Sequence, residues 1–250
     1  MKQIAIAGKG GVGKTTFTAL MMRYLLEHKS GKPILAVDAD PNANLNEALG
    51  LEVENTISQI IEDTKTPNAV PTGMSKEMYM EFKLQDALAE TNFYDLLVMG
   101  NPQRSGCYCY PNDLLRKHLE KLRSNYDYVL VDNEAGLEHL SRRIISAVDM
   151  LIVVSDAAAR SIRSAARVRE IAESVNLDIK EMYLIVTKVT GNEIEVLQPE
   201  IDKTGLQFLG TIPLDPKVAE YDVKGQALME LPDDSAAVQA VNAILQKLTL

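Results

Sequence analysis

The chain has 250 residues, and 46% of them are hydrophobic, so it is long and apolar enough to bury a full core. Its 26 basic and 35 acidic side chains give a net charge of −9. Such an acidic balance argues against a dedicated nucleic-acid-binding protein, which needs a basic surface. Two cysteines are too few for a disulfide framework, and the short apolar run at the N-terminus does not fit a signal peptide. We therefore expect a cytoplasmic protein that binds neither nucleic acid nor membrane.

Short apolar segments alternate with helical patterns along the chain. The apolar segments are mostly continuous, which is typical of strands covered on both faces. The expected strands are Gln3–Ala7, Ile34–Asp38, Tyr94–Met99, Tyr128–Asp132, Met150–Ser155, Met182–Thr187 and Gln207–Ile212. The expected helices are Thr15–His28, Leu45–Leu49, Met78–Ala89, Asn112–Arg123, His139–Val148, Ala158–Val175, Ile194–Lys203 and Ser235–Leu248. This order predicts one α/β domain over residues 1–250 with a mostly parallel, doubly wound sheet, and an irregular insertion near residues 62–78.

The strongest motif lies between the first strand and the first helix. Residues 8–16 read GKGGVGKTT and satisfy the phosphate-loop pattern G-x-x-x-x-G-K-[ST]. Backbone N–H groups of such a loop surround phosphate oxygens, its lysine reaches the terminal phosphates, and the following hydroxyl ligates Mg²⁺. The expected contacts to nucleotide and Mg²⁺ are Gly10, Gly11, Val12, Gly13, Lys14, Thr15 (Mg²⁺) and Thr16.

Two other strands end in acids, as a nucleotide site at the carboxyl edge of a parallel sheet requires. The first is followed by Asp40, with Asn44 close by, and the second ends at Asp132. Four apolar residues followed by an acid favour a Walker B strand, in which Asp132 holds Mg²⁺ through water. Either acid alone would fit a turn or a helix cap. The phosphate loop in the same chain favours the nucleotide role for both.

The two cysteines, Cys107 and Cys109, lie in an expected loop over residues 101–111. Two thiolates fill half of the four positions that Zn²⁺ or square-planar Ni²⁺ takes, so a second subunit of a symmetric dimer is a natural source of the other two. Inert buried thiols and a redox pair are the alternatives.

The extra lysine at position 9 makes KGGVGKTT resemble the deviant-Walker-A ATPases, which include nitrogenase iron protein and the Min and Par ATPases. Together with VDADPN, the C-x-C pair and DNEAGLEH, the chain resembles the CooC-type nickel-insertion ATPases. These mature carbon monoxide dehydrogenase, and a sister group matures acetyl-CoA synthase. The resemblance implies a homodimeric ATPase and nickel metallochaperone with one of these enzymes as its client.

The same resemblance implies roles for single residues. Lys9 reaches the partner's nucleotide, Asp40 positions the attacking water, and Gly136 meets the γ-phosphate. The family's adenine contacts fall on Thr187, Lys188, Pro213 and Asp215, although the family often has Asn where Thr187 stands.

Two alternatives stay open: a Min/Par-type positioning or partition ATPase, and an iron–sulfur electron-transfer ATPase. The second cysteine segment of nitrogenase iron protein is missing around Asp132, which argues against the latter. His139 is a candidate relay or auxiliary ligand, or simply a helix-start histidine. A helical face with Arg160, Arg163 and Arg167 is a solvated surface or a docking patch.

Overall fold

The computed structural model describes residues 1–29, 31–64, 66, 69–101, 109–135, 147–174 and 177–250. For residues 76–77, 109–115 and 123 it describes the backbone only. The strands are β1 (Lys2–Gly8), β2 (Ile34–Asp38), β3 (Leu88–Glu90), β4 (Asp95–Val98), β5 (Tyr128–Asp132), β6 (Ala147–Asp156), β7 (Asp178–Val189) and β8 (Gln207–Pro213).

The described helices range from 5 residues in α2 to 16 residues in α7. They are α1 (Lys14–His28), α2 (Leu45–Leu49), α3 (Ile57–Asp63), α4 (Lys76–Gln85), α5 (Cys109–Leu122), α7 (Ala159–Ser174), α8 (Glu193–Lys203), α9 (Pro216–Lys224) and α10 (Ala236–Leu245), with short 3₁₀ turns η1 (Arg123–Asn125) and η2 (Leu228–Glu230). None of the helices within the described ranges is both long and apolar enough to cross a membrane.

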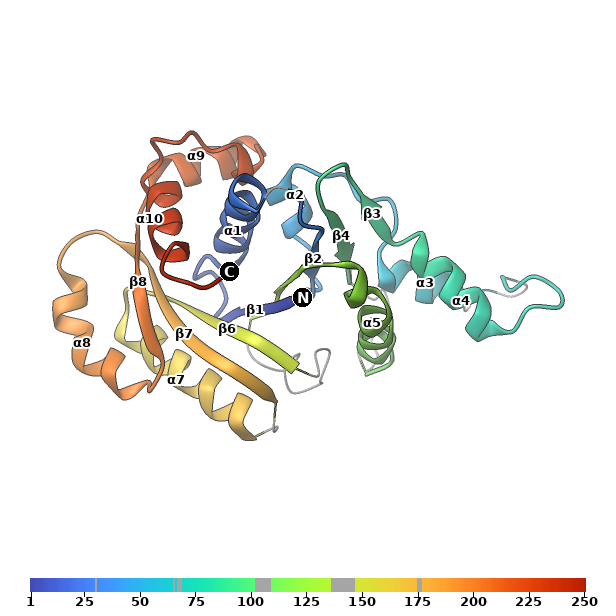
Figure 1. The fold of residues 1–250 in the computed structure, drawn as a ribbon, viewed down its shortest axis with the longest axis horizontal. Coiled ribbons are helices and arrows are strands. Elements are labelled where there is room, and N and C mark those ends of the chain that lie inside the picture. Colours follow the sequence, from blue (N-terminus) through green and yellow to red (C-terminus); the bar gives the residue numbers. More distant parts are fainter. Residues whose placement is uncertain (30, 65, 67–68, 102–108, 136–146, 175–176) are drawn as a thin grey trace.

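The strands form one eight-stranded sheet in the order β3-β4-β2-β5-β1-β6-β7-β8. All described pairings are parallel except that of β3 with β4 (Figure 1). The expected α/β fold with a mostly parallel sheet is thereby confirmed. Because parallel strands share a direction, the carboxyl ends of β1, β2, β5, β6 and β7 meet at one edge, which is where a ligand site forms.

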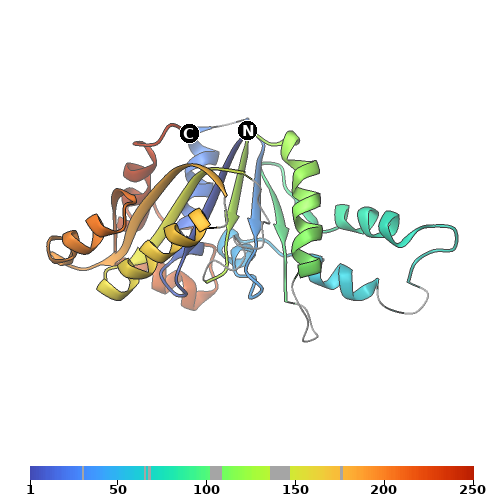
Figure 2. The ribbon, with the colours of Figure 1, turned by 90° about the horizontal axis from the view of Figure 1, so that it is seen from below.

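Alternate residues of each central strand enter different hydrophobic cores. In β1, Ile4 and Ile6 pack with α1, α2 and α10, whereas Ala5 and Ala7 pack with helices α3, α4, α5, α7 and α8. This is the period-two alternation of a strand covered on both faces. Figure 2 shows the helices on the two sides of the twisted sheet.

Two predicted helices end differently from the expectation. The helix expected over Met78–Ala89 stops at Gln85, and Ala89 lies in strand β3, opposite Leu96. Pairing with a neighbouring strand overrides the helical preference of these residues. The helix expected over His139–Val148 cannot include its last two residues, because β6 begins at Ala147. Val148, whose branched side chain suits a strand, pairs there with Ile179.

Two helices were not predicted. Helix α3 starts with a capping box, in which the Thr56 hydroxyl accepts the backbone N–H of Gln59 and the Gln59 side-chain oxygen accepts the backbone N–H of Thr56. Helix α9 starts at Pro216 after the N-cap Asp215 and ends before Gly225. Both sets of start signals are readable in the sequence.

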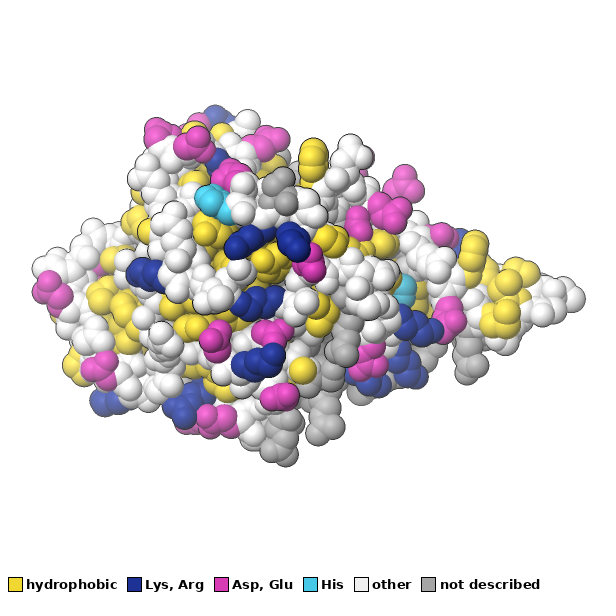
Figure 3. Space-filling model, in the orientation of Figure 1, with side chains coloured by type: hydrophobic (Ala, Val, Ile, Leu, Met, Phe, Trp, Pro, Cys, Tyr) yellow, Lys and Arg dark blue, Asp and Glu magenta, His cyan; other side chains and the backbone are white. Residues whose placement is uncertain are grey.

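Helix α4 and residues 69–75 before it form an arm that extends from the body (Figure 1). The irregular insertion expected near residues 62–78 is therefore partly helical, since α3 reaches Asp63 and α4 begins at Lys76. Hydrophobic side chains gather on the arm (Figure 3), and Met74, Met78 and Phe82 are exposed there.

The burial of helix α1 predicts a clear difference between two methionines. Met22 in α1 is fully buried, whereas Met78 in α4 is 60% exposed. Met22→Ala should lower the free energy of unfolding by about 2–5 kcal/mol through the lost packing and the cavity. Met78→Ala should leave it nearly unchanged. Urea unfolding of both variants measures this, and equal losses would contradict the assigned core.

Candidate functional site

The phosphate loop connects β1 to α1 at the carboxyl edge of the sheet. Gly8 is required at the turn, because a Cβ there would lie 2.2 Å from the carbonyl oxygen of Val154. Gly13 has a φ of 90° immediately before α1, and none of the described side chains caps the helix. The first turn of α1 also carries no acid. Its free N–H groups and positive dipole end are thus available to an anion.

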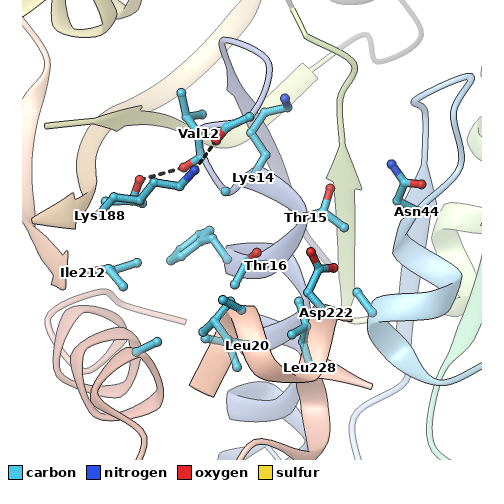
Figure 4. A pocket seen from close by; sticks show the side chains of 18 of the residues that line it. Val12, Lys14, Thr15, Thr16, Leu20, Asn44, Lys188, Ile212, Asp222 and Leu228 are labelled. Atoms are coloured by element: carbon cyan, nitrogen blue, oxygen red, sulfur yellow. Dashed lines mark hydrogen bonds between the residues drawn. The ribbon is translucent and has the colours of Figure 1, made fainter. Parts of the chain in front are cut away.

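A cavity of about 760 Å³ opens over this loop (Figure 4). Every loop residue expected to meet the nucleotide lines it, from Gly10 to Thr16. Lys14 is buried, and its Nζ lies 3.4 Å from the carbonyl oxygen of Lys9. Lys9 is exposed and directly precedes Gly10, which lines the cavity. The structure thus gathers the residues that the motif predicted.

Thr15 and Asp132 lie in direct contact, although they are 117 residues apart. The Thr15 hydroxyl donates to Oδ2 of Asp132 at 2.6 Å. The other carboxylate oxygen, Oδ1, is buried and has no partner among the described residues. Burial and, less strongly, the Asp38 carboxylate raise the pKa of Asp132 to about 7. An orphaned carboxylate oxygen beside a threonine hydroxyl suits Mg²⁺, a hard cation that prefers oxygen ligands.

A second buried acid, Asp38, organises the turn after β2. Its two carboxylate oxygens accept the backbone N–H groups of Asp40 (3.0 Å) and Leu45 (2.9 Å). Burial raises its pKa to about 6. Sequence reasoning named Asp40 and missed the role of Asp38, although an acid at the end of a fully apolar strand was a signal for it.

Asp40 and Asn44 both line the cavity, as Figure 4 shows for Asn44. Oδ1 of Asp40 accepts the backbone N–H of Asn42 at 2.9 Å and its side-chain amide at 3.0 Å. The carboxylate is thus held in place beside the phosphate loop. From there it can accept a hydrogen bond from a water molecule in the cavity.

The opposite wall of the cavity comes from β7, β8 and α9. Thr187, Lys188, Pro213 and Asp215 line it. However, both oxygens of Asp215 are already engaged. Oδ1 accepts the N–H of Lys217 at 2.9 Å, and Oδ2 accepts the hydroxyl of Ser235 at 2.6 Å. Asp215 thus connects the end of β8 to the start of α10. Its carboxylate has this structural role whether or not it also contacts the adenine base.

Several predicted residues lie outside the described residues: Cys107, Gly136 and His139. Cys109 is the first residue of α5, so the loop expected over 101–111 ends earlier than predicted. Pro111 is compatible with this start, because the first helical turn does not use its N–H groups. On α7, Arg160, Arg163 and Arg167 are all exposed, and Arg163 lies 3.6 Å from Glu200.

A model of the CobQ/CobB/MinD/ParA nucleotide binding domain matches residues 4–228. The chain belongs to this family. It is therefore a P-loop ATPase of the group that also contains the MinD and ParA proteins. It is 42% identical to an uncharacterized ATP-binding protein of Methanocaldococcus jannaschii over 98% of this chain and 97% of that one.

Two further similarities concern proteins with named roles. The carbon monoxide dehydrogenase accessory protein CooC of Rhodospirillum rubrum is 34% identical over 92% of this chain and 90% of its own. The MinD cell division protein of Aquifex aeolicus superposes with a TM-score of 0.71 at 26% identity, over 99% of this chain and 96% of its own. The ATPase therefore shares its fold with MinD.

The buried carboxylate at the site predicts an unusual pH dependence. The folded-state pKa of Asp132 is about 7, above its ordinary value of 3.8. Its contribution to stability is therefore fully present below 3.8 and is lost as the pH rises through about 7. Without Mg²⁺ and nucleotide, Asp132→Asn should raise the free energy of unfolding at pH 8 by up to a few kcal/mol, and by clearly less at pH 5, which lies between the unfolded-state pKa of 3.8 and the folded-state pKa of about 7.

Thermal or urea unfolding at both pH values measures this effect. Asp178→Asn, a change at an exposed carboxylate, serves as the control and should show no such difference between the two pH values. If Asp132→Asn destabilised the protein equally at pH 5 and pH 8, the assigned burial of a proton-binding carboxylate would be wrong.

Proposed function

We propose that this ATPase is a nickel-binding maturation factor that dimerises with ATP and delivers Ni²⁺ to a nickel enzyme. The client would be carbon monoxide dehydrogenase or acetyl-CoA synthase. Support comes from the likeness to the carbon monoxide dehydrogenase accessory protein of Rhodospirillum rubrum. The pair Cys107 and Cys109 adds a chemical reason, since thiolates suit Ni²⁺ and also Zn²⁺.

The observation that carries the proposal is the place where α5 begins. Strand β4 runs parallel to β2, so the segment after it leaves the sheet at the same edge as the phosphate loop. In Figure 2 both the phosphate-loop end of β1 and the start of α5 lie at the lower edge. Cys109 is the first residue of α5, and the first turn of a helix favours an anion such as a thiolate. Metal and nucleotide would then bind at one edge of the sheet.

The residues of the cavity suggest how hydrolysis proceeds. Lys14 and the loop amides hold and neutralise the phosphates, and Mg²⁺ beside Thr15 and Asp132 would add further positive charge. Asp40 orients the attacking water, and the developing charge at the γ-phosphate needs one more cation. The exposed Lys9 would supply it to the partner subunit's site, so that dimerisation controls turnover. Hydrolysis would then reset the dimer after metal transfer.

Two lysines of the phosphate loop should behave differently. Lys14→Ala should weaken ATP binding about ten- to hundredfold, because a charge-assisted contact to phosphate is lost. Lys9→Ala should keep ATP binding in one subunit but lose most turnover and ATP-dependent dimerisation. Fluorescent-nucleotide titration, phosphate release and light scattering measure these, with the exposed Lys203→Ala as control. Normal turnover in Lys9→Ala would remove its role across the interface.

The shared thiolate site predicts a metal stoichiometry of one Ni²⁺ or Zn²⁺ per dimer. Cys107→Ser and Cys109→Ser should each lose tight metal binding, since oxygen is a poor substitute for sulfur toward these metals. Metal titration combined with gel filtration, with and without ATP, measures both stoichiometry and assembly. Tight metal binding by a monomeric serine variant would contradict the shared site.

A further inference from the structure

Two adjacent residues at the end of β7 both reach the phosphate loop. The Thr187 hydroxyl donates to the carbonyl oxygen of Val12 at 2.7 Å and lies 3.2 Å from that of Ser155. Nζ of Lys188 donates to the carbonyl oxygen of Gly11 at 2.6 Å. Dashed lines in Figure 4 mark the bonds to Gly11 and Val12.

Neighbouring residues of a regular strand cannot do this, because successive side chains point to opposite faces. Lys188 breaks the alternation: it has a φ of 57°, in the left-handed region that non-glycine residues seldom occupy. The pairing of β7 with β8 shifts register between Val186 and Val189 at the same point. Such an irregularity re-aims a side chain and is common beside functional sites.

The two contacts act on a part of the loop with little restraint of its own. Glycine stands at positions 10, 11 and 13, and Gly11 and Gly13 both have positive φ. In a planar trans peptide the C=O and the following N–H point in opposite directions. Holding the carbonyls of Gly11 and Val12 toward β7 therefore turns the next two N–H groups, of Val12 and Gly13, away from β7.

We propose that Thr187 and Lys188 form a clamp that positions the phosphate loop, so that its N–H groups are set for phosphate before nucleotide arrives. The clamp rests on the nucleotide-binding role proposed for this cavity. Thr187 is then a positioning residue for the phosphates, and its hydroxyl, already engaged with Val12, does not read the adenine. Lys188 acts through Gly11 in the same way.

The test compares variants that remove the bonds with variants that keep them. Thr187→Val and Lys188→Met lose the donors, whereas Thr187→Ser and Lys188→Arg retain them. Thr187 is buried, but Lys188 is exposed, so Lys188→Met carries the test if Thr187→Val fails to fold. Lys188→Asn suits the left-handed backbone and lacks the reach, so it should loosen the loop without lowering the melting temperature.

The first readout is amide hydrogen exchange in the nucleotide-free protein. Exchange of the peptide covering residues 9–16 should rise in Thr187→Val, Lys188→Met and Lys188→Asn, and return to the wild-type rate in Thr187→Ser and Lys188→Arg. Unchanged exchange in Lys188→Met would overturn the clamp.

The second readout is affinity for ADP, ATP and GTP. Loss of the clamp should weaken ADP and ATP by the same factor, about three- to tenfold, and leave the preference for ATP over GTP unchanged. A loss for ATP alone would make Lys188 a direct γ-phosphate ligand, and a changed ATP-to-GTP ratio would make Thr187 a base contact. Either result overturns the clamp. If the wild-type protein bound no nucleotide, the proposed function itself would fail.

Discussion

The hydrogen bond from Thr15 to Asp132 is the contact on which the site depends. It joins the start of α1 to the end of β5, and thus places the phosphate loop beside a buried carboxylate. A buried carboxylate with one orphaned oxygen is unfavourable by itself. A cation bound there would supply the missing interaction. The same feature that lowers the free energy of unfolding would therefore favour binding of Mg²⁺ with nucleotide.

The parallel sheet accounts for how such distant residues meet. Residues from the ends of β1, β2, β5 and β7 converge because these strands share a direction and lie near one another in the sheet. Thr15, Asp38 and Asp132 are far apart in the sequence, and only the arrangement of the strands in the sheet brings them together. The topology also sets the beginning of α5 on that edge. A metal held at the cysteines would thus bind at the same edge of the sheet as the nucleotide.

Much of this site could be predicted because short sequence motifs identify it. The glycines and the lysine of the phosphate loop form one such motif, and an acid after an apolar strand forms another. The roles of Asp215 and Lys188 could not be predicted in this way. Asp215 looks like a base-site acid in the sequence, but its two oxygens hold Lys217 and Ser235. The reach of Lys188 depends on a left-handed φ and a register shift, which only tertiary structure fixes.

The fold shows the same division. Continuous apolar runs identify the central strands, whereas β3 forms only because β4 lies opposite it, and Leu-Ala-Glu has no strand preference of its own. Local sequence preference predicts an element correctly where burial of its apolar residues supports the same structure. It predicts the wrong element where pairing with another strand determines the structure.

We propose that two subunits share one metal through their cysteine pairs. A mixed dimer tests it most directly, with one wild-type subunit and one subunit carrying both Cys107→Ser and Cys109→Ser, isolated through two different affinity tags in the presence of ATP. Its metal content is then measured by mass spectrometry. A shared four-thiolate site predicts that the mixed dimer loses the tightly bound metal that the wild-type dimer holds. Retention of one tightly bound metal by the mixed dimer would show that each subunit binds its own, and would contradict the account.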